Sequence, residues 1–235
     1  MYILSKLDMA ALAYFFVAWI SFHVFADHSR WREKNVTEAM HGYRYRWMTE
    51  MYKRELKMVD AQILGNLSNG IAFFASTAIL IVGSLCAVLG ATDTVVAVLE
   101  DLPIAVSTSK VVWELKVLLL ICIFVYAFVK FAWSFRLSSY FAIMIGAAPY
   151  QPLSEEDAKR EAHRPARMSN LVGVHFNRGL RAYFFALAAL GWFIHPIAFV
   201  AATSWIVAML YRREFRSRSL RVLTGDTKSI QTEFK

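Results

Sequence analysis

Four stretches of the chain are apolar over about the length that a helix needs to cross a bilayer, which is roughly 20 residues for a hydrocarbon core of about 30 Å. They cover residues 7–25, 71–91, 111–133 and 182–211. The first three are uninterrupted, whereas the fourth contains Pro196. The pattern predicts an all-α integral membrane protein, a bundle of three clear transmembrane helices plus a fourth segment broken at the proline.

The fourth apolar stretch allows two interpretations, because proline removes a backbone hydrogen bond and kinks or breaks a helix. A re-entrant hairpin would place one arm on each side of His195 and Pro196. Irregular backbone at such a break is tolerated where protein covers it. A kinked single crossing is the alternative. Basic residues flank the stretch on both sides, which favours the hairpin, and both interpretations stay open.

The basic residues of the connections predict the orientation of the first three spans, because cytoplasmic loops carry the excess of Lys and Arg. The connection over residues 26–70 carries many, whereas that over residues 92–110 carries Lys110 alone. The third connection is basic again, from Lys159 to Arg178. The first and third connections are therefore predicted to be cytoplasmic and the N-terminus to lie outside. The expected location is a bacterial inner (plasma) membrane.

A helical period also runs through the first connection, over residues 36–62. Asn35 and Glu38 offer a start that resembles a capping box. The pattern predicts an amphipathic cytoplasmic helix that runs straight into the second span. Such a helix packs on the bundle or lies at the membrane surface, and its Met and aromatic face also suits the docking of a partner.

A stripe of polar side chains continues the same face into the second span. Polar groups in lipid need partners, so we expect the stripe to face other helices or a water-filled cavity. Packing between helices is one interpretation, and a polar path for an ion or ligand is the other. Including three side chains from other spans, the candidates for such a path are Gln62, Asn66, Asn69, Thr77, Ser84, Lys116, Lys130 and His195.

Small residues lie beside this stripe on the second span. Because small side chains allow two helix backbones to approach closely, they predict a helix-packing face. The residues of this face are Gly65, Ala72, Ser76 and Gly83.

Composition supports the membrane assignment, since 57% of the 235 residues are hydrophobic and only 19% are charged. We expect one membrane domain over residues 1–235, with a basic tail over residues 212–235. The net charge of +8 includes five arginines that follow the last apolar stretch. They predict contact with anionic lipids, at about 1 kcal/mol per charge near the surface, rather than with nucleic acid. They are Arg212, Arg213, Arg216, Arg218 and Arg221.

Candidate chemistry is sparse. The chain has no phosphate-binding glycine loop, dinucleotide fingerprint, nucleophile elbow or His-Glu-x-x-His zinc pair. His195 lies near the middle of the longest apolar stretch, where hydrogen bonding to the broken backbone is the main interpretation. Proton relay and metal or haem ligation are the alternatives, with His23 as a second weak haem candidate. We predict no catalytic residue, no metal and no cofactor.

Five stretches of the chain carry a resemblance to a known family. They are Phe-His-Val at 22–24, Arg-Trp-Met at 46–48, the run over 54–64, Phe-Phe-Ala-Ser-Thr-Ala-Ile at 73–79, and Asn-Arg-Gly-Leu-Arg-Ala-Tyr at 177–183. In these stretches the sequence resembles domain of unknown function 599, a family of uncharacterised polytopic membrane proteins that occurs in bacteria and plants. The resemblance implies a membrane fold of the same kind, and it transfers no catalytic or binding residue.

Three functions are compatible with these patterns. The favoured one is a scaffold or accessory subunit that assembles as a homo-oligomer or within a larger membrane complex. An oligomeric channel or transporter that uses the polar stripe of the second span is the alternative. A haem or proton-relay protein that uses His195 is a minor one. Enzymatic activity has no support in the sequence.

Overall fold

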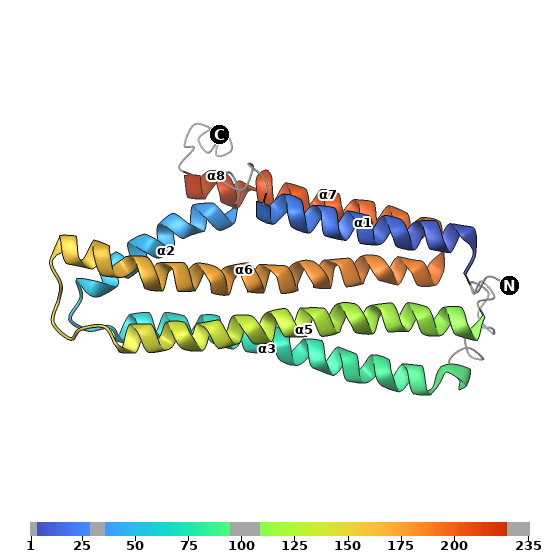
Figure 1. Cartoon of the computed structure of the whole chain (residues 1–235), viewed down its shortest axis with the longest axis horizontal. Helices are drawn as coiled ribbons and strands as arrows, with labels where there is room; N and C mark the ends of the chain where they lie inside the picture. The colour runs from blue at the N-terminus through green and yellow to red at the C-terminus, as the bar shows by residue number, and fades with distance from the viewer. Residues whose placement is uncertain (1–3, 29–35, 95–108, 225–235) are drawn as a thin grey trace, which may run out of the picture. The chain divides into compact units, whose positions relative to one another are not determined.

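A computed structural model of the chain describes residues 4–28, 36–94 and 109–224. All regular structure in these ranges is helical, which confirms that the fold is all-α (Figure 1). The helices are α1 (Lys6–His28), α2 (Val36–Tyr52), α3 (Met58–Gly90), α5 (Lys110–Gly146), α6 (Glu155–Ile194), α7 (Pro196–Phe215) and α8 (Arg218–Thr224).

Three of the described helices are long and apolar enough to cross a membrane, over Lys6–Asp27, Met58–Gly90 and Lys110–Gly146. They contain the first and third predicted spans and all but the last residue of the second. However, α3 has 33 residues and α5 has 37. At a rise of 1.5 Å per residue these helices are about 50 Å and 55 Å long, well beyond a hydrocarbon core of about 30 Å. Part of each helix must therefore lie outside the apolar layer.

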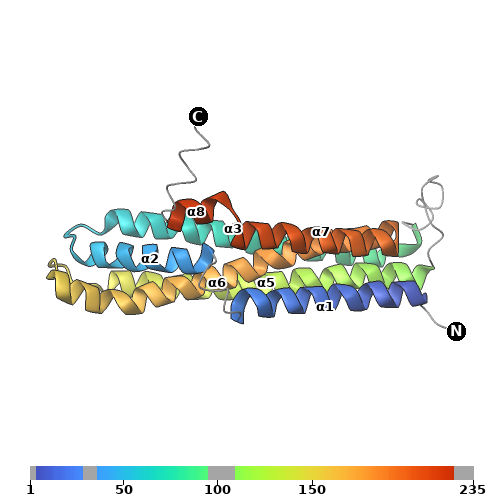
Figure 2. The same ribbon diagram turned by 90° about the horizontal axis from the view of Figure 1, so that it is seen from above.

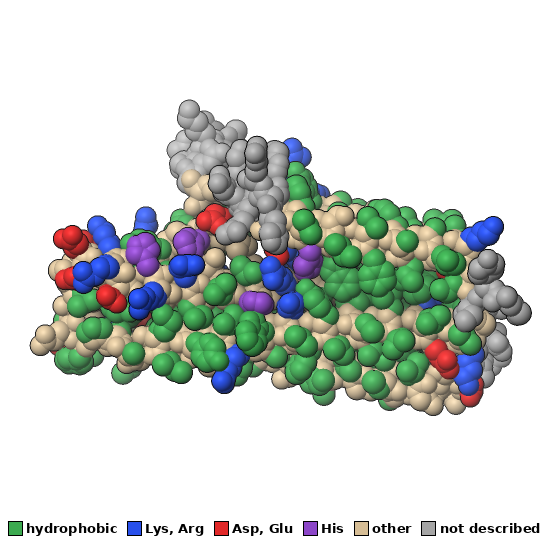
Figure 3. All heavy atoms as spheres, in the orientation of Figure 1, with side chains coloured by type: hydrophobic (Ala, Val, Ile, Leu, Met, Phe, Trp, Pro, Cys, Tyr) green, Lys and Arg blue, Asp and Glu red, His purple; other side chains and the backbone are tan. Residues whose placement is uncertain are grey.

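The chain forms two compact units, and several helices contribute to both. Unit 1 contains residues 1–27, 75–129 and 178–210, and unit 2 contains residues 28–74, 130–177 and 211–235. On the face shown in Figure 3, hydrophobic side chains cover α1 and α7, whereas charged side chains gather over α2 and the start of α6.

Aromatic side chains fill the core of unit 1. Phe15 of α1 is fully buried and contacts Phe185 of α6 and Phe199 of α7, with ring centroids 5.8 Å and 5.0 Å away. Trp192 stacks on Phe199 at 5.4 Å. Because α1 supplies the central ring, α7 and the second half of α6 pack on it.

Contacts along α1 give the direction of α6 in unit 1. Near the start of α1, Asp8 accepts a hydrogen bond from Trp192. At the end of α1, Asp27 binds Arg178. Positions rise along α1 while they fall along α6, so the two helices are antiparallel.

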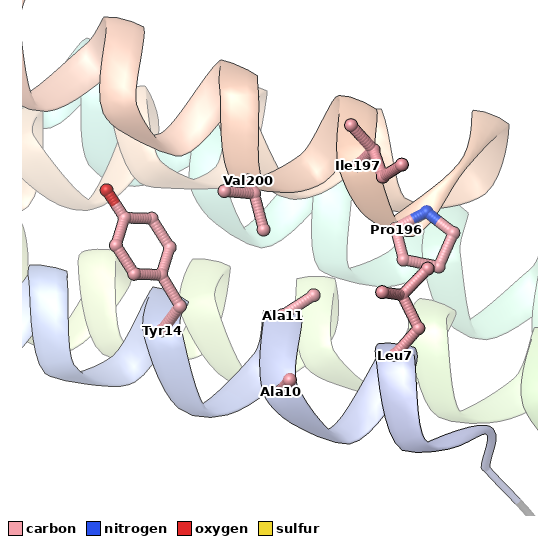
Figure 4. Close-up of a pocket in the computed structure, with 7 residues that line it drawn as sticks. All are labelled: Leu7, Ala10, Ala11, Tyr14, Pro196, Ile197 and Val200. Carbon is pink, nitrogen blue, oxygen red and sulfur yellow. The ribbon is translucent and has the colours of Figure 1, made fainter.

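Contacts between α1 and α7 show that these two helices run in the same direction. Leu7 lies across from Pro196 at the start of α7 (Figure 4). Further on, the Tyr14 hydroxyl is 2.8 Å from the Ser204 hydroxyl. Positions rise along both helices, so α7 is parallel to α1 and antiparallel to α6. In unit 1, α6 and α7 therefore form a hairpin with its break at His195. Figure 1 shows α7 alongside α1.

In unit 2, α2 packs antiparallel to the first half of α6 (Figure 2). The Tyr45 hydroxyl donates to the Lys159 carbonyl oxygen at 3.1 Å, and Arg44 donates to Asn170 at 2.9 Å. Met48 and Met51 are fully buried in the core of this unit. Three small α6 residues, Ala158, Ala162 and Ala166, let α2 approach α6 closely.

The predicted continuous helix over residues 36–62 is wrong, because α2 ends at Tyr52 and α3 begins only after a turn. Contacts made with a distant segment stabilise the turn. The Leu153 amide donates to the Tyr52 carbonyl oxygen at 3.1 Å, and Lys57 Nζ donates to the Pro149 carbonyl oxygen at 2.7 Å. The helical period is similar on both sides of the turn, so it gives no sign of the break.

Candidate functional site

A buried ionic cluster in unit 1, the Asp27 cluster, joins α1 to α6. Arg178 Nε donates to one carboxylate oxygen of Asp27 at 2.8 Å, and Arg181 donates to the other at 2.9 Å. The Arg181 side chain is only 5% exposed, against 27% for Arg178. One carboxylate thus holds two guanidinium groups, and the cluster has an excess positive charge.

Aromatic groups surround this cluster. The Arg181 guanidinium lies 5.8 Å from the centroid of the Phe22 ring. The residue after Phe22 is His23, and its Nε2 atom is 3.3 Å from the hydroxyl of Tyr126 in α5. Arginine over an aromatic face and a carboxylate with two donors are stabilising arrangements. These contacts therefore connect α1 with α5 and α6.

A second cluster in unit 1, the Asp8 cluster, lies near the start of α1. The Asp8 carboxylate accepts hydrogen bonds from Trp192 Nε1 at 2.8 Å and from the Ser5 hydroxyl at 2.6 Å. Lys116 is buried beside it, with its ammonium 5.8 Å from the Trp192 ring and 5.9 Å from the Phe193 ring. Among the described residues, no carboxylate forms an ion pair with this lysine. The Asp8 carboxylate attracts this lysine electrostatically, and the two ring contacts add to its stabilisation.

Unit 2 contains the Asp60 network at the start of α3. The Asp60 side chain is completely buried. It accepts hydrogen bonds from Trp47 Nε1 at 2.7 Å and from Arg54 at 3.1 Å. The network links the end of α2 to the start of α3 across the turn. Its role in the structure is to set the angle at which the chain enters α3.

The polar stripe of α3 does not face the interior of the chain. Gln62, Asn66 and Asn69 are exposed, and Thr77 is partly exposed. Ser84 is also exposed, and its hydroxyl donates to the Leu80 carbonyl oxygen at 3.0 Å within the helix. No path through the described part of the chain is lined by this stripe, and a path between several copies stays a prediction.

The small-residue face of α3 is open as well. Gly65, Ser76 and Gly83 are exposed, and Ala72 is partly exposed. No atom lies within 4 Å of the place where a Cβ would stand at Gly65 or Gly83. Within the apolar window of α3 only 11% of residues are buried, compared with 33% for α5. The chain itself leaves this helix largely uncovered.

The remaining candidates for a path have different surroundings. Lys116 belongs to the Asp8 cluster, whereas His195 is exposed at the hairpin break. His195 Nδ1 accepts a hydrogen bond from the Ile197 amide at 3.2 Å, so it binds the broken backbone. Lys130 is partly buried in unit 2.

The two haem candidates lie at opposite ends of α1. His23 is next to the Asp27 cluster, whereas His195 is close to the Asp8 end, so the structure does not bring them together. In the part of the chain that the structure describes, no group of three or more His, Cys, Asp or Glu side chains is placed to hold a metal ion.

The predicted lipid-contact arginines lie where α7 ends and in α8. Four of them are exposed and Arg221 is partly exposed. Residues 225–235 of the predicted basic tail lie outside the described residues.

An apolar groove lies between α1 and α7 in unit 1 (Figure 4). Its volume is 270 Å³. It offers contact to hydrocarbon and no charged group. The lining residues are Leu7, Ala10, Ala11, Tyr14, Pro196, Ile197 and Val200.

Sequence reasoning missed Asp27 and Asp60, the acidic residues that organise two of the three clusters. A signal for the first existed, because Arg178 and Arg181 are three positions apart and so lie on one face of a helix. Their common partner is far away in sequence, and the pattern along the chain does not identify it.

Three described helices are long and apolar enough to cross a bilayer, which is compatible with an all-helical membrane protein. Among such proteins, the chain belongs to the family described as protein of unknown function, DUF599, which it matches over residues 10–219. No curated protein and no solved structure matches the chain. Stretches that carry the resemblance supply Trp47, Arg54 and Asp60 of one network and Arg178 and Arg181 of the Asp27 cluster.

Proposed function

We propose that this chain is a non-catalytic structural subunit of the bacterial inner membrane, which associates with a second copy of itself through the open face of α3. The observation that carries the proposal is the low burial of α3, with 11% of its apolar window buried. A helix this exposed gains packing contacts from a partner.

The chemistry of the face suits another copy of the chain. Ser76 and Gly83 are small, so a partner helix can approach the backbone closely. Asn66 and Asn69 each carry a donor and an acceptor, so identical amides can pair across a two-fold axis. No charged residue lies between Asp60 and Asp93. Two chains of net charge +8 therefore meet on this face without direct repulsion.

The two ionic clusters of unit 1 support a placement in the bilayer. Asp8 and Asp27 are 19 positions apart on α1, which at 1.5 Å per residue is about 28 Å, close to the hydrocarbon core of about 30 Å. One cluster then lies at each boundary. The hairpin of α6 and α7 starts at the Asp27 cluster and reaches the Asp8 cluster, so both arms cross the membrane. The first and third connections and the arginines after α7 then lie on the cytoplasmic side, as the positive-inside rule favours.

The same placement accounts for the length of α3. A crossing takes about 20 residues, which counted back from Gly90 reaches about Ile71. The preceding part of α3, with Gln62, Asn66 and Asn69, then extends into the cytoplasm. Its exposed amides are thus in contact with water or with a partner rather than with lipid.

The test is the oligomeric state of purified protein in detergent, compared between Gly83→Leu and Gly42→Leu. Neither position has an atom within 4 Å of the added Cβ in the chain itself. We expect the wild-type and Gly42→Leu proteins to be dimeric and the Gly83→Leu protein to be monomeric, because leucine keeps the second α3 at a distance. A monomeric wild-type protein would reject the proposal.

Cross-linking gives a second measurement that does not depend on a bulky side chain. In a chain with Cys86 and Cys122 replaced by serine, a cysteine at Ser76 is expected to form a disulfide between two copies in membranes. A cysteine at Val17 of α1, which is 63% exposed, is the control and should remain monomeric. Equal cross-linking from both positions would indicate random collision and not a specific contact.

A further inference from the structure

Positive charge is concentrated directly after the apolar arm of α7. Residues 196–210 contain no charged side chain, whereas residues 211–221 contain five arginines and one glutamate. Arg212, Arg213 and Arg216 are exposed. The change from apolar to basic happens within two residues, at the end of the helix where cations are also favoured by the helix dipole.

Three of these five arginines lack an acidic partner in the part of the chain that the structure describes. Among the described residues, no carboxylate forms an ion pair with Arg212, Arg216 or Arg221. Elsewhere in unit 2 basic residues do have acidic partners, such as Lys53 with Glu155 at 2.8 Å. Arg212, Arg216 and Arg221 therefore lie close together in sequence without an acidic partner in the described part of the chain.

Aromatic and apolar groups accompany the arginines. The rings of Tyr211 and Phe215 pack with centroids 5.3 Å apart. In α8, Val222 is 61% exposed. Tyrosine near the headgroups and an apolar side chain turned outward are typical of segments that lie at a membrane surface.

The position of α8 is fixed by α2. The Tyr43 hydroxyl donates to the Leu223 carbonyl oxygen at 3.3 Å. The basic segment is thus attached to the folded chain at both ends, by the arm of α7 and by this contact with α2. Arg212 lies in the last turn of α7 and Arg216 directly follows the helix, where its amide donates to the Arg212 carbonyl oxygen at 3.0 Å.

We infer that Arg212 and Arg216, with the aromatic pair beside them, form a binding site for the headgroups of anionic phospholipids. The inference rests on the proposed placement of α7 as a membrane arm, which brings its end to the headgroup layer. Guanidinium groups bind phosphate oxygens through two parallel hydrogen bonds. An anionic headgroup has no ammonium group to neutralise its phosphate, so the phosphate oxygens are available for these bonds.

The test uses the detergent-solubilised full chain and its thermal unfolding midpoint during titration with phosphatidylglycerol. A ligand that binds the folded state raises the midpoint, and the titration gives an apparent dissociation constant. We expect phosphatidylglycerol to raise it, and phosphatidylcholine and inorganic phosphate at equal concentration to leave it unchanged. Stabilisation by phosphatidylcholine, or by phosphate alone, would overturn the inference.

Two double variants with the same loss of charge locate the site. Arg212→Gln with Arg216→Gln is expected to weaken the apparent affinity about 30-fold. Each lost charge removes about 1 kcal/mol, which is slightly more than a factor of about five in affinity. Arg164→Gln with Arg167→Gln, two exposed arginines of α6, should bind as the wild type does. Arg212→Lys with Arg216→Lys keeps the charge and should retain most of the affinity. Equal weakening by both glutamine pairs, or by neither, would overturn the assignment.

These outcomes are separate from the proposed self-association. If the lipid titration gives a negative result, the expected effect of Gly83→Leu on oligomeric state is unchanged. If the protein is monomeric, it can still bind phosphatidylglycerol.

Discussion

Asp27 is the residue on which the packing of α1 against α6 depends most. Its carboxylate is 14% exposed and binds Arg178 and Arg181 at once. A buried charge without its partner is far less favourable than an exposed one, because the protein interior cannot replace the lost hydration. The cost of removing this carboxylate is therefore set by the two arginines that stay behind.

Asp27→Asn is expected to lower the free energy of unfolding by about 3 kcal/mol, the low end for breaking a buried pair, since Arg178 retains some solvent contact. Unfolding of the protein in detergent by heat or denaturant measures the loss. Asp157→Asn is the control, because its pair with Arg160 is largely exposed and should contribute less than about 1 kcal/mol. Similar losses in both variants would contradict this role for Asp27.

At the scale of single residues, the sequence identified chemistry that acts locally and missed chemistry that acts at a distance. The contact of His195 with the Ile197 amide is of the kind that the sequence favoured, because both groups lie next to the proline that breaks the helix. The partners of Asp27 are 151 and 154 positions away. No local pattern encodes such a pairing, which arises only when α1 and α6 pack.

At the scale of elements, the hairpin of α6 and α7 depends on a close approach of backbones. A Cβ at Gly191 would lie 3.0 Å from the Ala198 carbonyl oxygen and 3.2 Å from the Phe199 Cα atom. Both neighbours are backbone atoms, so they move only if the two arms separate. Glycine at this position therefore lets α7 turn back tightly after the break.

Gly191→Ala is expected to destabilise the protein by about 1–3 kcal/mol, as overpacking of a close contact does. In an open helical position the same change normally stabilises by about 0.5–1 kcal/mol, because alanine is the better helix former. Gly42→Ala in α2 is the control for such an open position, since nothing lies within 4 Å of its added Cβ. Thermal unfolding of both variants should give shifts of opposite sign, and a stabilised Gly191→Ala protein would exclude the close approach.

The elements themselves were predictable where hydropathy decides them. Three apolar helices were expected and are present, because about 20 apolar residues in a row give an unambiguous signal. The break between α2 and α3 was not expected. It is stabilised by Tyr52 and Lys57 through bonds to the segment around Pro149, so it depends on tertiary contacts that a helical period does not contain.

At the scale of the whole molecule, the charges and the hairpin together determine the proposed topology. If both arms of the hairpin cross the bilayer with the three long helices, the chain crosses five times. An N-terminus outside then requires a C-terminus in the cytoplasm. A kinked single crossing would place the arginines after α7 outside, against the positive-inside rule.

A reporter that is active only in the cytoplasm distinguishes these topologies. Joined after Lys235, it is expected to be active, because α7 returns to the side on which α6 begins. The same reporter inserted in the connection between α3 and α5 should be inactive, and it serves as the control. The opposite pair of results would exclude the five-crossing arrangement.

The long separation between Asp27 and its arginines has a consequence for how the protein is made. Arg181 is synthesised 154 positions after Asp27. At about 5–20 residues per second the ribosome takes roughly 8–30 s to cover that interval. During this time α1 carries an acidic residue at its end without the partners that later bury it. The packing of α1 in unit 1 is therefore completed only when α6 has been made, and a nascent chain that stops before α6 leaves Asp27 without its two arginines.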